Sequence, residues 1–127
     1  MLEEKPFYLK WFFDNGTFNK NAITADDLRE YARCYSKPRG LTAGFSYYRA
    51  LPEDMNFNEI QATKKLKIPV LVLGGQFSFG SKIVASWKSA AENVKCVVIA
   101  DSGHYMLDEQ PLLILEATLA FLKSPEN

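Results

Sequence analysis

The sequence predicts an α/β protein, with a helical segment over residues 1–66 followed by a β-α-β-α unit over residues 67–127. Aromatic-rich helical patterns fill the first segment. In the second, residues 68–73 and 94–100 form short apolar runs rich in branched side chains, which are typical of buried parallel strands. An amphipathic helical pattern separates the two runs, as a crossover between parallel strands requires. Two such strands leave unpaired edges, so we expect a partner chain to complete the sheet, unless the sequence is a fragment.

Four helices are expected in the first segment, over residues 3–13, 25–35, 41–51 and 56–65. Thr24 is the expected N-cap of the second helix, and acidic residues follow it in the first turn, where the helix dipole favours negative charge. Pro52 is expected to end the third helix, because a proline inside a helix removes a backbone hydrogen bond. Trp11 and Phe12 in the first helix are interpreted as core residues in preference to pocket residues.

Two more helices are expected in the second segment, over residues 81–91 and 111–122. Pro111 lies at the first position of the last helix, where proline is favoured. Residues 101–104 form the expected loop at the carboxyl end of the second strand. Asp108 and Glu109 are interpreted as first-turn charges of the last helix.

The composition excludes several classes of function. Fifteen basic residues balance fifteen acidic ones, which removes the positive footprint of a nucleic-acid-binding protein and any polybasic membrane anchor. No apolar run approaches the roughly 20 residues needed to span a bilayer, and no signal peptide is visible at the polar N-terminus. Cys34 and Cys96 lie far apart and form no metal or redox motif. We therefore expect a cytoplasmic protein without a metal, a cofactor, a nucleic-acid partner or a membrane partner.

His104 is the only histidine, and it follows the second strand in a glycine-containing loop. In open α/β sheets, ligands bind beyond the carboxyl ends of the strands. An imidazole at that position suits a general base, because imidazole exchanges protons near neutral pH. The alternative is a loop histidine without a chemical role.

Several segments together resemble one family. Residues 101–111 (DSGHYMLDEQP) resemble the histidine loop of α/β-hydrolases, in which a Gly-His pair ends the last strand and a Glu-Gln-Pro stretch opens the final helix. Residues 68–75 (IPVLVLGG) resemble the penultimate strand of that family. Residues 27–38 and 45–50 look like the helical cap of epoxide hydrolases and related dehalogenases. The resemblance covers about residues 7–123 and implies a partial α/β-hydrolase fold, namely the cap and the last two strand-helix units of the C-terminal portion.

The resemblance also identifies what is missing. The family's nucleophile elbow and oxyanion-hole segment lie before the cap, and the 127 residues contain neither a Gly-x-Ser-x-Gly elbow nor an equivalent with aspartate. Residues 74–80 carry no carboxylate, so the resemblance places the acid that orients the histidine outside this chain as well. Asp101 is close to His104 in sequence, but a turn-forming role is favoured for it over that of orienting acid. His104 is then a vestigial general base.

The resemblance suggests ligand-contacting residues too. Epoxide hydrolases use cap tyrosines to hydrogen-bond the epoxide oxygen, and Tyr48 matches the position of one of them, with Tyr47 as the less favoured neighbour. The alternative is that Tyr48 packs within the cap beside Phe45, with its hydroxyl at the rim. Phe77 and Phe79 follow the first strand, where lining an apolar substrate pocket and packing in the core are equally favoured.

These expectations lead to two functions. In the first, the chain is a truncated, epoxide hydrolase-related protein without a nucleophile, which self-associates as a homodimer or binds a small apolar ligand. In the alternative, it is half of a split hydrolase that acts on epoxides, haloalkanes or esters only with a complementary N-terminal chain. In an intact enzyme of this kind, a carboxylate attacks the epoxide carbon, tyrosines protonate the oxygen, and the histidine activates the water that hydrolyses the ester. A fragment without a separate role is the third interpretation.

Overall fold

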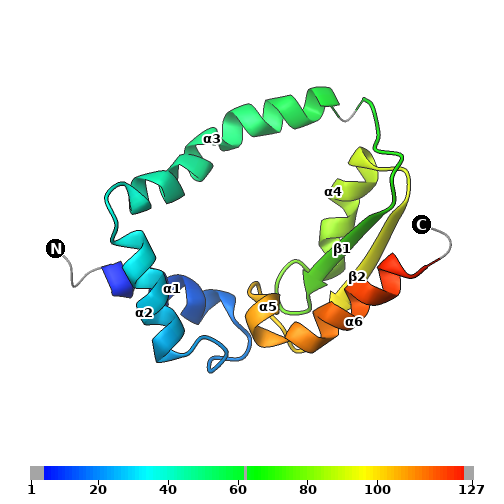
Figure 1. Ribbon diagram of the computed structural model, residues 1–127. Helices are drawn as coiled ribbons and strands as arrows, with labels where there is room; N and C mark the ends of the chain where they lie inside the picture. Colours follow the sequence, from blue (N-terminus) through cyan, green and yellow to red (C-terminus); the bar gives the residue numbers. More distant parts are fainter. Residues whose placement is uncertain (1–4, 62, 125–127) are drawn as a thin grey trace.

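The computed structural model describes residues 5–61 and 63–124 (Figure 1). The helical half contains α1 (Lys5–Gly16), α2 (Ala25–Tyr35) and α3 (Gly40–Gln61). The β/α half contains β1 (Val70–Gly75), η1 (Gly80–Lys82), α4 (Ile83–Ala90), β2 (Val94–Ile99), α5 (Met106–Glu109) and α6 (Pro111–Leu122). Figure 1 shows α3 running from the end of α2 to the segment that enters β1, while the other side of the helical half approaches α5. The backbone therefore traces a ring, closed where the loops at α1 and α5 meet.

α2 begins with a capping box that two side chains encode. The Thr24 hydroxyl accepts a hydrogen bond from the backbone N–H of Asp27 (3.2 Å), and the Asp27 carboxylate accepts one from the backbone N–H of Thr24 (2.9 Å). These bonds satisfy backbone donors that have no partner within the first turn of a helix. The predicted N-cap is confirmed.

α3 is a single helix where two were expected. It runs from Gly40 to Gln61 and contains Pro52 in its interior, so the expectation that Pro52 ends a helix is wrong. The proline ring removes one backbone donor, which deprives the carbonyl of Tyr48 of its partner within the helix. Every residue of α3 is exposed or half-buried, and water can therefore bond to that carbonyl in place of the missing donor.

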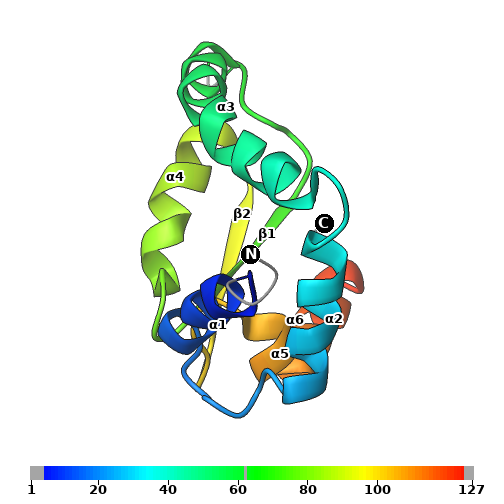
Figure 2. The ribbon, with the colours of Figure 1, turned by 90° about the vertical axis from the view of Figure 1, so that its left-hand side faces the viewer.

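The two strands pair in parallel, as predicted. The register runs from Val70 opposite Val94 to Gly75 opposite Ile99. β1 begins later than the apolar run that predicted it, because Pro69 has no N–H to contribute to a strand ladder. Figure 2 shows the strands between α4 on one side and α6 on the other, which is the arrangement of an α/β sheet.

The segment before α6 differs from expectation. Asp108 and Glu109 do not lie in the first turn of the last helix but in α5, a separate single turn. Gln110 separates the two helices, with φ at −140° and ψ at 56°. Pro111 accounts for this break, because a proline disfavours the helical conformation in the residue before it. α6 then begins at Pro111, as predicted.

The buried apolar core lies mainly in the β/α half. Its members there are Val72, Ala91, Ile99 and Ile114. Leu9 of α1 is also buried. Trp11 is 60% exposed, so its interpretation as a core residue is wrong. Its ring rests edge-on against Phe12, with 5.2 Å between centroids, and this contact leaves much of the indole in solvent. Phe12 is half-buried.

Candidate functional site

The loop that carries His104 is held by hydrogen bonds on both sides. Asp101 adopts a left-handed conformation with φ at 48°, and its backbone N–H donates to the side-chain carbonyl of Gln76 (2.9 Å). Ser102 is fully buried, and its hydroxyl donates to the carbonyl of Ile99 (2.9 Å). The side-chain amide of Gln110 donates to the carbonyl of Asp101 (3.2 Å). Asp101 thus lies at the turn after β2, in the conformation that aspartate tolerates better than most residues.

Glycines allow three backbone segments to approach one another closely at this loop. A Cβ atom on Gly75, at the end of β1, would collide with the carbonyl oxygen of Gly103. A Cβ on Gly103 would in turn collide with the carbonyl oxygen of Gly16 and crowd the backbone of Phe18. The backbone N–H of His104 donates to the carbonyl of Gly16 (2.7 Å). The end of α1, the end of β1 and the histidine loop are therefore packed backbone to backbone.

Glu109 joins the helical half to the histidine loop, a role that sequence analysis missed. Its side chain is buried, with 8% of its surface exposed. One carboxylate oxygen, Oε1, accepts a hydrogen bond from the N–H of Gly103 (2.9 Å). The other, Oε2, accepts from the N–H groups of Phe18 (2.7 Å) and Asn19 (2.9 Å). The acid of the Glu-Gln-Pro stretch was the only signal in the sequence, and it fitted a helix-terminal charge equally well.

His104 is exposed at the carboxyl end of the two strands, as predicted. Its ring lies edge-on to Phe79, at 6.1 Å between centroids, and edge-on to Tyr105, at 5.2 Å. Phe77 points to a different neighbour and stacks on Phe18, with centroids 4.1 Å apart and rings nearly parallel. Phe79 therefore lies beside the histidine, whereas Phe77 bridges to the segment after α1.

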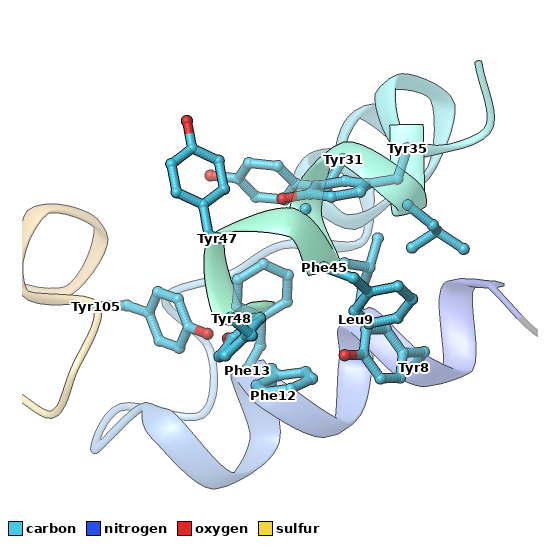
Figure 3. Close-up of a pocket in the computed structure, with 12 residues that line it drawn as sticks. Tyr8, Leu9, Phe12, Phe13, Tyr31, Tyr35, Phe45, Tyr47, Tyr48 and Tyr105 are labelled. Carbon is cyan, nitrogen blue, oxygen red and sulfur yellow. The ribbon is translucent and has the colours of Figure 1, made fainter. Parts of the chain in front are cut away.

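An open hollow of about 440 Å³ lies in the helical half, beside the histidine loop (Figure 3). The residues that line it are Tyr8, Leu9, Phe12, Phe13, Tyr31, Tyr35, Leu41, Gly44, Phe45, Tyr47, Tyr48 and Tyr105. None of these twelve residues has a charged side chain at neutral pH. α1, α2 and α3 supply all of them except Tyr105, which the histidine loop contributes. The hollow is thus apolar in its walls and polar only in its phenol groups and backbone.

The structure divides the predicted site residues into two groups. Tyr47 and Tyr48 line the hollow, and Tyr47 is 80% exposed at its rim, with its hydroxyl turned away in Figure 3. His104, Phe77 and Phe79 lie outside the lining residues, around the histidine loop. Their roles, and those of the two tyrosines, stay predictions. Among the residues that the structure describes, no group of three or more His, Cys, Asp or Glu side chains is placed to hold a metal ion.

Tyr105 connects the two groups, and sequence analysis missed this too. It lines the hollow, while its ring contacts both His104 and Phe13, the latter at 4.8 Å between centroids. Burial raises the pKa of Tyr105, and interactions with Tyr48 and Asp108 raise it further. The phenol therefore stays protonated at neutral pH and remains a hydrogen-bond donor. Its place next to His104 was the only signal in the sequence.

Comparison with known proteins relates the whole arrangement to one family. The chain is 31% identical over 116 residues to a soluble epoxide hydrolase of Corynebacterium sp. (strain C12), a match that covers 90% of this chain and 40% of that relative. The crystal structure of Cfl2 from Burkholderia cenocepacia superposes with a TM-score of 0.88 at 30% identity, over 95% of this chain and 42% of Cfl2. The epoxide hydrolase CorEH superposes with a TM-score of 0.86 at 30% identity, over 95% of this chain and 43% of CorEH. No protein-family model matches the sequence.

The chain corresponds to the C-terminal portion of an epoxide hydrolase-like α/β-hydrolase. The predicted fold class is confirmed, because the solved structures superpose over both the helical half and the β/α half. This epoxide hydrolase-like chain spans about 40% of the length of the relatives it matches. In the part of it that the structure describes, no helix combines the length and the apolar character needed to cross a membrane.

Proposed function

We propose that this epoxide hydrolase-like chain binds a small apolar ligand with an oxygen acceptor, such as an epoxide, and does not hydrolyse it alone. The tyrosine-lined hollow carries the proposal. Its volume of about 440 Å³ lies within the range of small-molecule sites, and its walls are aromatic with a few phenol groups to fix orientation. Similarity to a soluble epoxide hydrolase supports an epoxide as the ligand.

Within this proposal, Tyr48 donates a hydrogen bond to the ligand oxygen, and rings such as Phe12 and Phe45 enclose the apolar body. His104 is exposed and lies outside the lining residues. It has no nucleophile to serve within these 127 residues, which contain no Gly-x-Ser-x-Gly elbow. Binding without turnover is the activity that the residues present can support.

The proposal is tested by adding styrene oxide to the 127-residue chain and measuring binding by saturation-transfer NMR and diol formation by chromatography. We expect saturable binding without diol. Tyr48→Phe should weaken binding by about fivefold, the worth of one hydrogen bond. Trp87→Phe, on α4 outside the hollow, is the matched aromatic control. Absence of saturable binding overturns the proposal. Diol formation that disappears in His104→Ala overturns its non-catalytic part.

We further propose that the chain self-associates as a homodimer through apolar surface of the β/α half. α6 exposes Leu112, Leu115 and Leu122 to solvent, by 72%, 53% and 69%. Near the start of β1, Ile68 is 66% exposed. Exposed apolar surface and unpaired strand edges both favour association. Alternatively, a complementary N-terminal hydrolase chain covers this apolar surface. This alternative is supported by the fact that the chain spans only about 40% of the length of its relatives.

Light scattering distinguishes a homodimer from a monomer that requires a complementary hydrolase chain. A dimer mass that falls to the monomer value in Leu115→Glu, but not in Lys88→Glu on α4, supports self-association. Both residues are exposed; Leu115→Glu introduces a negative charge at the surface, and Lys88→Glu replaces a positive surface charge with a negative one. A monomer at all concentrations overturns the homodimer. Epoxide hydrolysis that appears only on addition of an N-terminal hydrolase chain then supports the alternative.

A further inference from the structure

Where α2 meets α3, the hollow is bounded by an aromatic ring that lies against two glycine positions. Tyr35 is the last residue of α2, and Gly40 and Gly44 lie one turn apart on α3. A Cβ atom on Gly40 would lie 2.7 Å from the carbonyl oxygen of Tyr35. A Cβ atom on Gly44 would lie 3.1 Å from Cε1 of the Tyr35 ring. The two glycines therefore allow the backbone and the ring of Tyr35 to approach α3 closely.

Gly44 is explained by its neighbour and not by the helix that contains it. It lies in the interior of α3, where glycine weakens a helix relative to alanine. A methyl group at this position would press on the Tyr35 ring, which would have to shift to make room. Gly44 and Tyr35 both line the hollow, so a shift of the ring changes the shape of this wall.

The hollow extends along α3 from Tyr48 toward this wall. Gly44 and Tyr48 both line it, and they are four residues apart on one face of the helix, about 6 Å along its axis. Figure 3 shows Tyr48 beside Tyr105 of the histidine loop, and Tyr35 farther from that loop. A ligand whose oxygen lies at Tyr48 can therefore extend along α3 toward Gly44 and Tyr35.

We propose that Tyr35 and Gly44 limit the length of the ligand, and that the hollow takes an uncharged ligand whose second apolar ring lies against this wall. The volume of about 440 Å³ is in the range of sites that hold drug-sized ligands, and none of the lining side chains is charged at neutral pH. This inference rests on the proposed ligand-binding function. It adds the size class of the ligand and the two residues that determine it.

The test compares styrene oxide with 4-phenylstyrene oxide, which carries a second ring at the end away from the epoxide. Titrations followed by saturation-transfer NMR give the dissociation constants. We expect the wild-type chain to bind the two-ring compound about tenfold more tightly, because the second ring buries apolar surface. Gly44→Ala should weaken binding of the two-ring compound about fivefold and that of styrene oxide less than twofold, because the displaced Tyr35 ring meets only the longer ligand.

Further variants show whether the effect depends on the Tyr35 ring. In a Tyr35→Ala background, Gly44→Ala should change the binding of 4-phenylstyrene oxide by less than twofold, because the ring that the methyl group displaces is gone. Ser46→Thr is the matched control. It also adds one methyl group to α3, at an exposed position outside the lining residues, and should leave both affinities unchanged. Gly44→Ala should fold, because alanine is the better helix former.

The outcomes separate this inference from the proposed function. If the wild-type chain binds neither compound, both are overturned. If it binds the two compounds equally tightly, the proposed function stands and the size class is overturned. Weakening of both compounds to the same extent in Gly44→Ala, or a fivefold loss that persists without the Tyr35 ring, contradicts the role of Tyr35 and Gly44.

Discussion

The two halves of the molecule are held together by different kinds of contact. In the β/α half, backbone groups fix the geometry through the parallel ladder of β1 and β2 and the close glycine approaches at Gly75 and Gly103. In the helical half, α2 and α3 contain no buried residue. Aromatic rings join both helices to α1: Tyr31 of α2 packs against Phe13 at 5.2 Å between centroids, and Phe45 of α3 packs edge-on against Tyr8 at 5.7 Å.

This difference assigns separate tasks to the two halves. The strand ladder and the close glycine contacts fix the relative positions of the backbone segments. They therefore hold the loop that carries His104 in one position. Edge-on ring contacts between half-exposed helices allow small changes in spacing, which suits the walls of a hollow that admits a ligand. Glu109 links the rigid half to the adaptable one through its three backbone hydrogen bonds.

The largest expected effect comes from the core of the β/α half. Ile99 is 2% exposed, and Ile99→Ala should lower the free energy of unfolding by about 3 kcal/mol, because it removes apolar contacts and leaves a cavity. Trp11→Ala in the helical half deletes a larger side chain that is 60% exposed, and should cost less than about 1 kcal/mol. Urea unfolding followed by circular dichroism measures both values. Equal losses of unfolding free energy in Ile99→Ala and Trp11→Ala would contradict the difference in packing between the two halves.

The next effect concerns the link between the halves. Glu109→Ala removes one buried carboxylate and leaves three backbone N–H groups without their acceptor, which should cost about 2 kcal/mol. Hydrogen exchange should accelerate at the amides of Phe18, Asn19 and Gly103. Glu116→Ala, an exposed acid on α6, is the matched control. Unchanged protection of the three amides in Glu109→Ala would contradict the assignment of Glu109 as the link.

Residue patterns predicted the parts of the fold that local chemistry determines. The apolar runs gave both strands, and Thr24 with the acids that follow it gave the start of α2. Pro52 misled, because the cost of a proline in a helix depends on whether water reaches the freed carbonyl, and exposure is a tertiary property. The interpretation of Trp11 as a core residue failed for the same reason. Its spacing shows on which face of the helix it lies, but not whether another element covers that face.

The candidate site was predictable only in part. His104 and Tyr48 could be selected because a sequence motif surrounds each of them. Glu109 and Tyr105 could not, because their partners lie in α1, in the segment after it and in α3, far away in sequence. A contact between distant segments leaves no spacing pattern in a single sequence.

The smallest expected effect is on the pH dependence of stability, to which one aspartate from each half should contribute with opposite sign. Partial burial raises the pKa of Asp108 in α5, and repulsion from Asp27 and Glu109 raises it further. Ionised Asp108 therefore destabilises the folded chain above its folded pKa, and this cost vanishes below the unfolded value near 3.8. Asp108→Asn should stabilise the chain at pH 7 by less than about 0.5 kcal/mol, because the side chain is exposed, and should leave it unchanged near pH 3.

Asp27 in α2 should show the opposite sign. Hydrogen bonds from the Thr24 hydroxyl and backbone N–H hold the pKa of Asp27 below its usual value. Its contribution to stability is therefore present above the unfolded pKa and is lost as the pH falls through the lower folded pKa. Asp27→Asn should destabilise the chain at pH 7 and lose that effect in acid, as thermal unfolding across this pH range would measure. If both variants shift stability in the same direction, the two carboxylates do not experience the separate environments that the structure gives them, and the contrast between Asp27 in α2 and Asp108 in α5 fails.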